Sequence, residues 1–254
     1  RSIELNKESA RKMTKLDACL KRCNTPISNY VSTTESKSYQ DVVKKLAAGI
    51  SSTEELFKCI HNRTVNKWGK DTILAALTGL VTEVDADIIG DYWTEVQLAK
   101  QHKQKYQDKM LDICKEHFPK EMERLQTIPG IKERSATSII AELGTDMKSF
   151  ETAAHLVSWA GLKPRNDESA GRIKGRRITH GNKYLRQILI ECAWAASKTK
   201  GCFYNRFSYT QVNVRRKNRM KVQVAIARKL LVAIWHVIHD GVDYKEYTDI
   251  DKSR

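Results

Sequence analysis

The sequence has few of the residues that interrupt helices. Its 254 residues include four prolines and twelve glycines, so few positions are expected to break a helical run. It also lacks an uninterrupted apolar stretch of about 18 residues, the length that a membrane-spanning helix needs. With 41% hydrophobic and 30% charged residues, the composition is typical of a globular chain. No alternating apolar pattern calls for a large sheet, and we expect a mainly α protein with no membrane partner.

The six cysteines lack the spacing of a metal or redox motif, because none belongs to a CxxC pair. Cys19 and Cys23 lie one helical turn apart beside apolar residues, which is typical of reduced cysteines on a helix face. His236 and His239 lie close together on an apolar helix, but a structural zinc site needs four ligands and the neighbouring sequence offers no others. We therefore expect no metal site in this chain.

Acidic residues are scarce in one segment of the chain. Residues 163–221 contain sixteen Lys and Arg against three Asp and Glu, an excess of +13. The remaining residues contain 29 bases and 27 acids, so this segment accounts for most of the net charge of +15. A solvated face usually mixes both signs, and a segment of one sign favours a surface that binds nucleic-acid phosphates. The alternatives are an acidic partner of another kind or a contribution to solubility.

Residues 1–121 are predicted to form a helical linker and coiled-coil region. Apolar residues recur at helical spacing over 2–23 and again over 39–48, with a polar connection between them. Residues 62–70 are polar and predict a turn.

From Asp71 to His117 the apolar residues recur mostly at steps of three and four, and no proline intervenes before Pro119. This pattern predicts one continuous helix, too long for a single globular core, that serves as a coiled-coil dimerisation arm. The alternative is a long helix that packs against its own chain.

Residues 122–254 are predicted to form a second helical unit. Near its start, Pro129 and Gly130 separate two apolar segments, which predicts a helix, a tight turn and a second helix. This layout resembles a helix-hairpin-helix, in which amides at a helix N-terminus can hold a phosphate. The same turn also serves elsewhere as a simple helix connection.

Three more helices are predicted in this unit, over 152–160, 182–197 and 218–239. Between the first two lies a basic, glycine-containing stretch, 162–177, with few apolar residues. It predicts a surface loop or a short hairpin. Five aromatic residues are interleaved with the bases that follow; some could stack on nucleobases, although most aromatics at helical spacing are core. They are Tyr184, Phe203, Tyr204, Phe207 and Tyr209.

Six segments of the second unit carry a family resemblance. They are IPGI at 128–131, AELGTDM at 141–147, HLVSWAGLKPRNDESAG at 155–171, RITHGNKYLR at 177–186, ECAWAASKTK at 191–200 and ARKLLVAIWHVIHDGVDY at 227–244. In order and spacing they resemble the C-terminal transposase domain of the insertion-sequence 110/1111 family, the bridge-RNA-guided recombinases related to the Piv/MooV invertases. The resemblance covers residues 122–244 and is looser before them.

The resemblance implies a DNA recombinase, or transposase, of a mobile element. It implies that Ser169 attacks DNA and forms a covalent phosphoserine intermediate, and that a bridge RNA guides the reaction. Donor DNA, target DNA and this RNA would be partners of a homodimer, or of a dimer of dimers, in the cytoplasm of a prokaryote, at its nucleoid.

The family's RuvC-like domain, which holds four metal-binding acids, is not recognised in this sequence. The segment KMTKLDA at 12–18 echoes part of it, and we treat that echo as chance. The chain is therefore expected to be a fragment that is inactive alone, with Mg²⁺ bound only in the RuvC-like domain. Asp167 and Glu168 lie among several bases and are better explained by ion pairs than by a metal.

The residues around Ser169 give independent support for a nucleophile. Phosphoryl transfer to a serine needs positive charge near the phosphorus, and six bases lie within eight residues of Ser169. Ala170 and Gly171 are small and would let a DNA strand approach. The alternative is that Ser169 binds a phosphate or caps a turn. The residues predicted to bind nucleic acid are Gly130, Lys132, Lys163, Arg165, Arg172, Lys174, Arg176, Arg177, Lys183, Arg186, Arg215, Arg216, Lys217, Arg219 and Lys221.

Two other kinds of function remain open from the sequence. One is a non-catalytic helix-hairpin-helix scaffold that binds junction DNA or RNA. The other is a metal-dependent junction nuclease that uses only RuvC-like acids. A covalent bond between protein and DNA would distinguish the recombinase from both.

Overall fold

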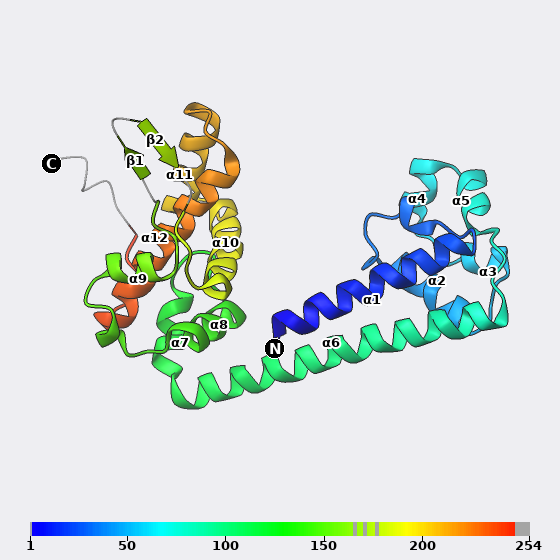
Figure 1. Cartoon of the computed structure of the whole chain (residues 1–254), viewed down its shortest axis with the longest axis horizontal. Helices are drawn as coiled ribbons and strands as arrows, with labels where there is room; N and C mark the ends of the chain where they lie inside the picture. Colours follow the sequence, from blue (N-terminus) through cyan, green and yellow to red (C-terminus); the bar gives the residue numbers. More distant parts are fainter. Residues whose placement is uncertain (1, 165–166, 170–171, 176–177, 247–254) are drawn as a thin grey trace. The chain divides into compact units, whose positions relative to one another are not determined.

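The computed structural model describes residues 2–164, 167–169, 172–175 and 178–246. Helices dominate this part of the chain, as predicted (Figure 1). The chain divides into two compact units, residues 1–107 and 108–254, so the division falls inside the long helix α6 (Glu83–His117).

In the first unit, α1 (Ser2–Arg22) and α6 run antiparallel to each other (Figure 1). Two ion pairs join them: Lys12 Nζ lies 2.6 Å from the Glu95 carboxylate, and Arg22 lies 2.7 Å from that of Asp85. Apolar side chains of α1, α2 and α6 form one core with those of the shorter helices. The other elements of the unit are η1 (Ile27–Asn29), α2 (Lys37–Ala47), α3 (Thr53–Phe57), α4 (Asn62–Trp68) and α5 (Lys70–Leu77).

The predicted continuous helix from Asp71 is wrong, because α5 ends at Leu77 and α6 begins at Glu83. Gly79 lies in the break, so close to the end of α1 that a Cβ there would meet Thr25 Oγ1 at 2.1 Å. A reciprocal cap then starts α6: Thr82 Oγ1 accepts from the Asp85 amide at 3.2 Å, and Asp85 Oδ2 accepts from the Thr82 amide at 3.3 Å.

The chain itself covers much of the apolar stripe that had predicted a coiled coil. Ile73 and Leu77 are buried in the core of the first unit, as are Ile89 and Val96 of α6. The prediction that a partner helix covers this stripe is therefore wrong for these residues, and the alternative of a helix packed within its own chain holds for this part of α6. The polar turn predicted over 62–70 is also wrong, since it forms α4.

In the second unit, α12 (Arg219–His239) is the central helix and packs against α7, α9, α10 and α11. Among the described helices it alone is long and apolar enough to cross a membrane, but 56% of it is buried inside the unit, as in a core helix. The other helices are α7 (Pro119–Gln126), α8 (Glu133–Leu143), η2 (Met147–Ser149), α9 (Ala153–Trp159), α10 (Lys183–Lys198), α11 (Phe203–Tyr209) and the π-helix η3 (Thr210–Val214).

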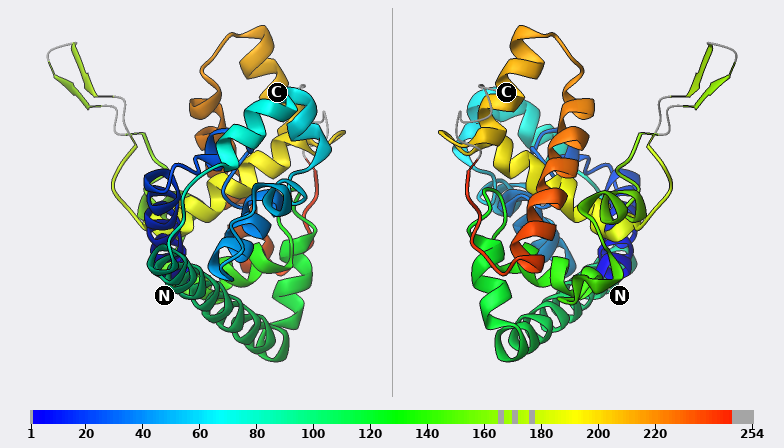
Figure 2. Two further views of the ribbon diagram at one scale, coloured as in Figure 1. Left: turned by 90° about the vertical axis from the view of Figure 1, so that its right-hand side faces the viewer. Right: turned by 90° about the vertical axis from the view of Figure 1, so that its left-hand side faces the viewer.

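A two-stranded hairpin interrupts the helices, as the stretch 162–177 had predicted. Strand β1 (Asp167–Ser169) pairs antiparallel with β2 (Arg172–Gly175). The hairpin extends away from the helices of its own unit (Figure 2). Some of the residues predicted to bind nucleic acid therefore lie on this projecting hairpin, and others lie on the packed helices of the unit.

Candidate nucleic-acid interface

Two glycines join the base of the hairpin to the helical body. Gly161 follows α9 with a left-handed φ of +70°, and Gly181 precedes α10. A Cβ on Gly181 would lie 2.3 Å from the Gly161 nitrogen and 2.5 Å from the Trp159 carbonyl oxygen. Only glycine fits such an approach of two backbones, so these residues are explained by packing at the hairpin base.

Asn182 ties this base to two helices. Its Oδ1 caps α10 by accepting from the amides of Tyr184 at 2.9 Å and Leu185 at 3.0 Å. Its Nδ2 donates to Glu142 Oε2 on α8 at 2.9 Å. One side chain therefore starts α10 and connects it to α8.

Hydrogen bonds join the two arms of the hairpin next to the two glycines, on the side toward the strands. The Thr179 amide donates to the Lys163 carbonyl at 3.0 Å, and Pro164 forms an isolated bridge with Ile178. Arg186 of α10 donates from Nη1 to the Thr179 carbonyl at 3.5 Å. Arg186, predicted to contact phosphate, thus contacts the hairpin base, whereas the Lys163 side chain is exposed.

Within the hairpin, the register places Ser169 opposite Arg172. The Arg172 side chain is exposed, so its guanidinium group can bind an anion near the predicted nucleophile. For Ser169 and Lys174 the structure describes the backbone alone, in β1 and β2. Three predicted bases, Arg165, Arg176 and Arg177, lie outside the described residues.

A second basic element connects α11 to α12. The π-helix η3 closes with a bond from the Arg215 amide to the Thr210 carbonyl at 2.9 Å, and the Lys217 amide then donates to the Gln211 carbonyl at 2.9 Å. Between them, Arg216 has a left-handed φ of +53°. Arg215, Arg216 and Lys217 are all exposed. These backbone bonds present three consecutive cationic side chains to solvent.

Two further bases, Arg219 and Lys221, lie in the first turn of α12. Asn218 caps this helix by accepting from the amides of Met220 at 2.9 Å and Lys221 at 3.3 Å. Bases at a helix N-terminus are repelled by the helix dipole, and this turn has no acidic residue. Their position does not favour helix stability and is suited to binding an anion.

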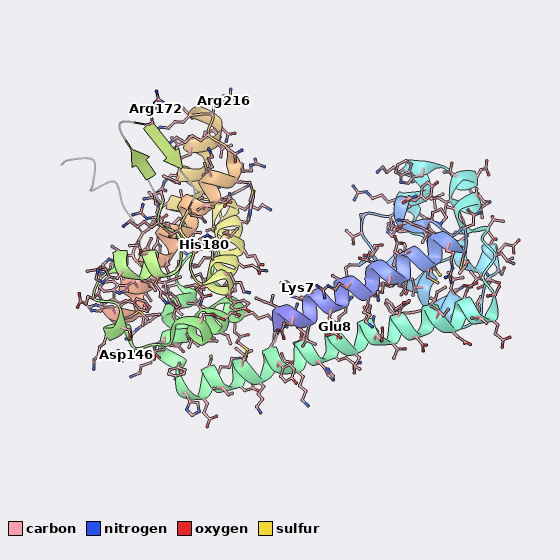
Figure 3. The ribbon with its side chains drawn as sticks, viewed as in Figure 1. Lys7, Glu8, Asp146, Arg172, His180 and Arg216 are labelled. Carbon is pink, nitrogen blue, oxygen red and sulfur yellow. The ribbon has the colours of Figure 1, made fainter. Side chains whose placement is uncertain are left out.

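These five bases form what we call the basic run, residues 215–221. In the described part of the chain, none of the five has an acidic partner. Arg172 of the hairpin and Arg216 of the basic run lie toward the same end of the second unit, and Asp146 lies toward the other (Figure 3). The hairpin and the basic run are separate elements (Figure 2).

A tight turn joins α7 to α8, as predicted from Pro129 and Gly130. Gly130 has a φ of +86° and packs on α10, where a Cβ would lie 2.5 Å from the Cys192 carbonyl oxygen. Lys132 is exposed, but its amide donates to Ser135 Oγ at 2.8 Å, so this amide of the α8 N-terminus already has a partner. Nucleic-acid binding by Gly130 and Lys132 stays a prediction.

The structure separates the five interleaved aromatics into two groups. Tyr204 is buried, and Phe203 and Phe207 stack on each other at 5.8 Å, with Lys229 over both rings. Tyr184 and Tyr209 are 39% and 63% exposed. The Lys183 ammonium, a predicted phosphate contact, lies 5.0 Å from the Tyr184 ring centre. Of the five, these two tyrosines are the exposed ones, and they are best placed to meet a nucleobase.

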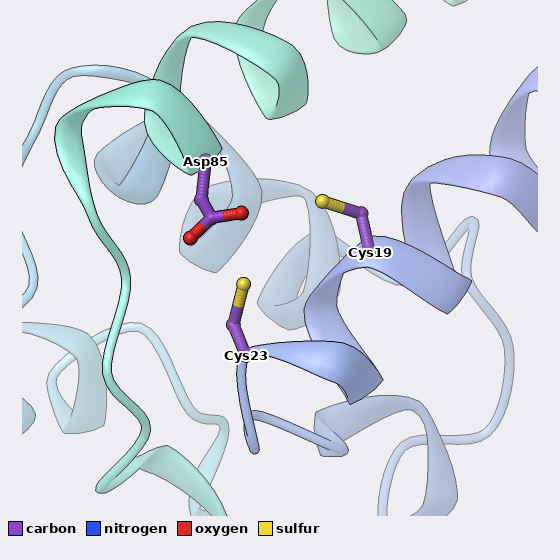
Figure 4. A group of neighbouring side chains, drawn as sticks. All are labelled: Cys19, Cys23 and Asp85. Carbon is purple, nitrogen blue, oxygen red and sulfur yellow. The ribbon is translucent and has the colours of Figure 1, made fainter.

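One group of metal-ligand type side chains meets in the first unit: Cys19, Cys23 and Asp85 face one another (Figure 4). Arg22 donates to Asp85 at 2.7 Å and to Cys19 Sγ at 3.5 Å, so a positive charge already occupies this group. Burial, together with the nearby Asp85 charge, raises the pKa of the Cys23 thiol to about 11. A metal ion would have to displace the guanidinium and remove that proton.

Comparison with known proteins finds a similarity in the second unit. The model of the Transposase IS116/IS110/IS902 family matches residues 122–208, which include the hairpin, its base and α10. Over these residues the second unit is similar to the transposases of that family.

Curated relatives align with the same part of the chain. A 43.6 kDa protein of insertion element IS110 from Streptomyces coelicolor is 30% identical over 122 residues, 48% of this chain and 29% of the relative. The pilin gene-inverting protein of Moraxella bovis is 32% identical over 119 residues, 46% of this chain and 36% of that protein. The transposase of element IS1111A from Coxiella burnetii is 26% identical over 142 residues, 55% and 38%. The chain thus aligns with about a third of the length of these relatives.

Proposed function

We propose that this chain is the strand-exchange and nucleic-acid-binding part of a DNA recombinase that moves a mobile element. The observation that carries the proposal is the hairpin, in which Ser169 lies opposite the exposed Arg172. The glycine contact at its base fixes the hairpin on the helical body within the segment matched by the transposase family.

Ser169 is the proposed nucleophile. Its hydroxyl oxygen attacks a backbone phosphorus and gives up its proton to a general base; the P–O bond to one strand end breaks, and the departing oxygen takes up a proton. The serine–phosphate ester then conserves the energy of the broken phosphodiester bond. The hydroxyl end of another strand can therefore displace the serine without ATP. Arg172 and Lys163 would stabilise the negative charge that builds up on the phosphoryl oxygens.

The basic run supplies the proposed phosphate contacts to DNA or to a guide RNA. In a guided reaction, base pairing between the bridge RNA and the donor and target DNA would read sequence, and the protein would read backbone shape and charge. A cluster of exposed Lys and Arg side chains that have no acidic partner among the described residues fits the second task.

The described residues do not fit the Mg²⁺ that the family implies. Magnesium prefers oxygen ligands in octahedral geometry, and the ligand-type group at Cys19, Cys23 and Asp85 is made of two thiols and one ion-paired carboxylate. We propose that this ion binds, as the resemblance implies, in a RuvC-like domain.

Strand exchange between two duplexes needs more than one serine, so we propose at least a dimer and a dimer of dimers on DNA. The part of α6 beyond its buried stripe exposes Leu98, Tyr106 and Ile113, which are 49%, 44% and 44% exposed and lie about two helical turns apart. This spacing is that of one side of a coiled coil, and we propose these residues as the dimer contact.

Substituting Ser169→Ala in the recombinase that contains this chain tests the proposal. Strand exchange should be lost while nucleic-acid affinity stays within about twofold, since the change removes one oxygen and no charge. Ser149→Ala, at an exposed serine of the same unit, is the control and should keep wild-type exchange. Exchange at the wild-type rate by Ser169→Ala would overturn the nucleophile. Magnesium-dependent cutting that persists in this variant would indicate the RuvC-type nuclease instead.

A further inference from the structure

A small pocket opens beside the basic run. It lies between α10, α11, η3 and α12 and has a cavity volume of about 200 Å³. Sites that enclose drug-sized ligands usually measure roughly 300–1,000 Å³, so this pocket is suited to a smaller group. The residues on which the argument depends are Trp194, Ser197, Asn205, Tyr209, Arg219 and Gln223.

The inner wall of the pocket holds a polar group without a partner. Gln223 is 1% exposed, and its Oε1 is buried and accepts no hydrogen bond from the described residues. Its Nε2 donates to Ser197 Oγ at 3.3 Å, and Ser197 Oγ donates its single proton to the Trp194 carbonyl at 2.9 Å. The serine thus has no proton left for an amide oxygen. This fixes the orientation of the Gln223 amide and leaves Oε1 as the open acceptor.

An unsatisfied buried acceptor is destabilising unless something brings it a donor. In a protein that binds nucleic acid, the groups that carry such donors on a flat ring are the nucleobases, through their amino groups and ring N–H groups. Asn205 does not fill this role: its Nδ2 donates to the Ser197 carbonyl at 2.7 Å, and no described residue donates to Gln223 Oε1. The inner wall is therefore set for a planar ligand that donates a hydrogen bond.

The mouth of the pocket has the two groups that a nucleotide requires. Tyr209 is 63% exposed and offers a ring on which any base can stack. Arg219 is exposed and belongs both to the pocket wall and to the basic run. The phosphate of a nucleotide whose nucleobase enters the pocket would thus lie beside the Lys and Arg side chains of the basic run, which we propose to bind the nucleic-acid backbone.

We propose that this pocket receives one unstacked nucleobase of the bound nucleic acid. The base donates a hydrogen bond to Gln223 Oε1 and stacks on Tyr209, and its phosphate contacts Arg219. The inference rests on the proposed function, because it assumes that the second unit binds nucleic acid, and it adds a site for an extrahelical nucleotide to that binding surface.

The test compares duplexes that differ in one unpaired position. Fluorescence anisotropy would measure the affinity of the chain for a duplex with a single-nucleotide bulge, for the same duplex with an abasic bulge, and for the duplex without a bulge. The set would be made once in DNA and once in RNA. We expect the bulged base to raise affinity about fivefold or more over the abasic bulge, as base–aromatic stacking does elsewhere. The better of the two sets identifies the sugar of the ligand.

Two variants assign that preference to the pocket. Gln223→Leu keeps the volume but removes the acceptor, and Tyr209→Ser removes an exposed ring; each should bring the bulged base to the affinity of the abasic bulge. Gln126→Leu, on α7 outside the pocket, is the matched control and should keep the preference. Because Gln223→Leu removes an unsatisfied polar atom, its melting temperature should equal or exceed that of the wild type.

The failures of the two proposals can be told apart. Equal affinity for the bulged base and the abasic bulge in both sets, with binding still weakened by salt, would overturn the pocket and leave nucleic-acid binding standing. A preference that survives in Gln223→Leu and Tyr209→Ser would also overturn it. No binding to any of the duplexes would overturn the proposed function and the pocket together.

Discussion

Gly161 and Gly181 contact each other through their backbones at the point where the hairpin leaves the helical body. This contact lies at the base of the arms that carry Ser169, and no side chain at either position intervenes. The proposed nucleophile, Ser169, would have to be held to within about an ångström of its target. The glycine contact, together with the cap formed by Asn182, is the feature of the second unit that can supply this precision.

Gly181→Ala should therefore disturb the hairpin base. The new methyl group would lie 2.5 Å or less from backbone atoms that cannot rotate away, and we expect a loss of about 3 kcal/mol in the free energy of unfolding. Gly201→Ala is the matched control: Gly201 also has a positive φ, of +83°, but its Cβ would meet nothing within 4 Å, so it should lose only about 1 kcal/mol. Urea unfolding of both variants checks this, and equal losses would contradict the packing argument.

Neutralising part of the basic run should weaken nucleic-acid binding and its dependence on salt. Each phosphate contact adds about 0.9 to the slope of log affinity against log salt on duplex DNA. The triple variant Arg215→Gln, Arg216→Gln and Lys217→Gln should lower that slope by about 1 to 3 units. Its control replaces Lys103, Lys105 and Lys109 of α6 by Gln, which removes the same charge elsewhere. If both triples lower the slope equally, net charge and not the basic run is responsible.

The buried thiol of Cys23 should make the first unit less stable at alkaline pH. Its pKa is about 11 in the folded chain against 9.0 for an ordinary thiol, chiefly because burial disfavours the thiolate. A raised pKa gives stability that is complete below about pH 9 and lost as the pH rises toward 11. Between those two pH values the urea midpoint of the wild type should fall more than that of Cys23→Ala. An equal fall in the two proteins would mean that this thiol is not buried as described.

The exposed side of α6 should control assembly. Replacing Leu98, Tyr106 and Ile113 together by Ser should convert the proposed dimer to monomer without unfolding, because all three side chains are already nearly half exposed and outside the core. Leu77→Asp would be uninformative, since Leu77 is buried in the core of the first unit. Light scattering at tens of micromolar checks the result. A wild-type chain that is already monomeric under those conditions would contradict dimerisation through this helix.

The sequence predicted the second unit more completely than the first. Its helices start and end at local signals, such as Asn182 before α10 and Asn218 before α12, and both side chains form the caps that their positions imply. The break between α5 and α6 has such a signal as well, in Thr82 and Asp85. The prediction of one continuous helix missed this signal because the apolar spacing continues across the break.

Other features had no recognisable signal in the sequence. Helix α4 starts with the ring of His61, whose Nδ1 accepts from the Arg63 amide at 3.1 Å, and histidine is not among the residues that commonly cap helices. The pairing of Gly161 with Gly181, and of Gln223 with Ser197, joins positions far apart in the chain. Spacing along a sequence does not report such pairs, so the hairpin base and the pocket emerged only from the structure.

The most direct measurement is to trap the covalent intermediate. The proposed recombinase would be incubated with donor and target DNA in which a bridging phosphate oxygen is replaced by sulfur, so that the departing strand cannot rejoin. The linked peptide would then be identified by mass spectrometry. The account predicts a DNA phosphate joined to Ser169, and no adduct in Ser169→Ala. Strand exchange without any adduct, or an adduct on another residue that persists in Ser169→Ala, would contradict it.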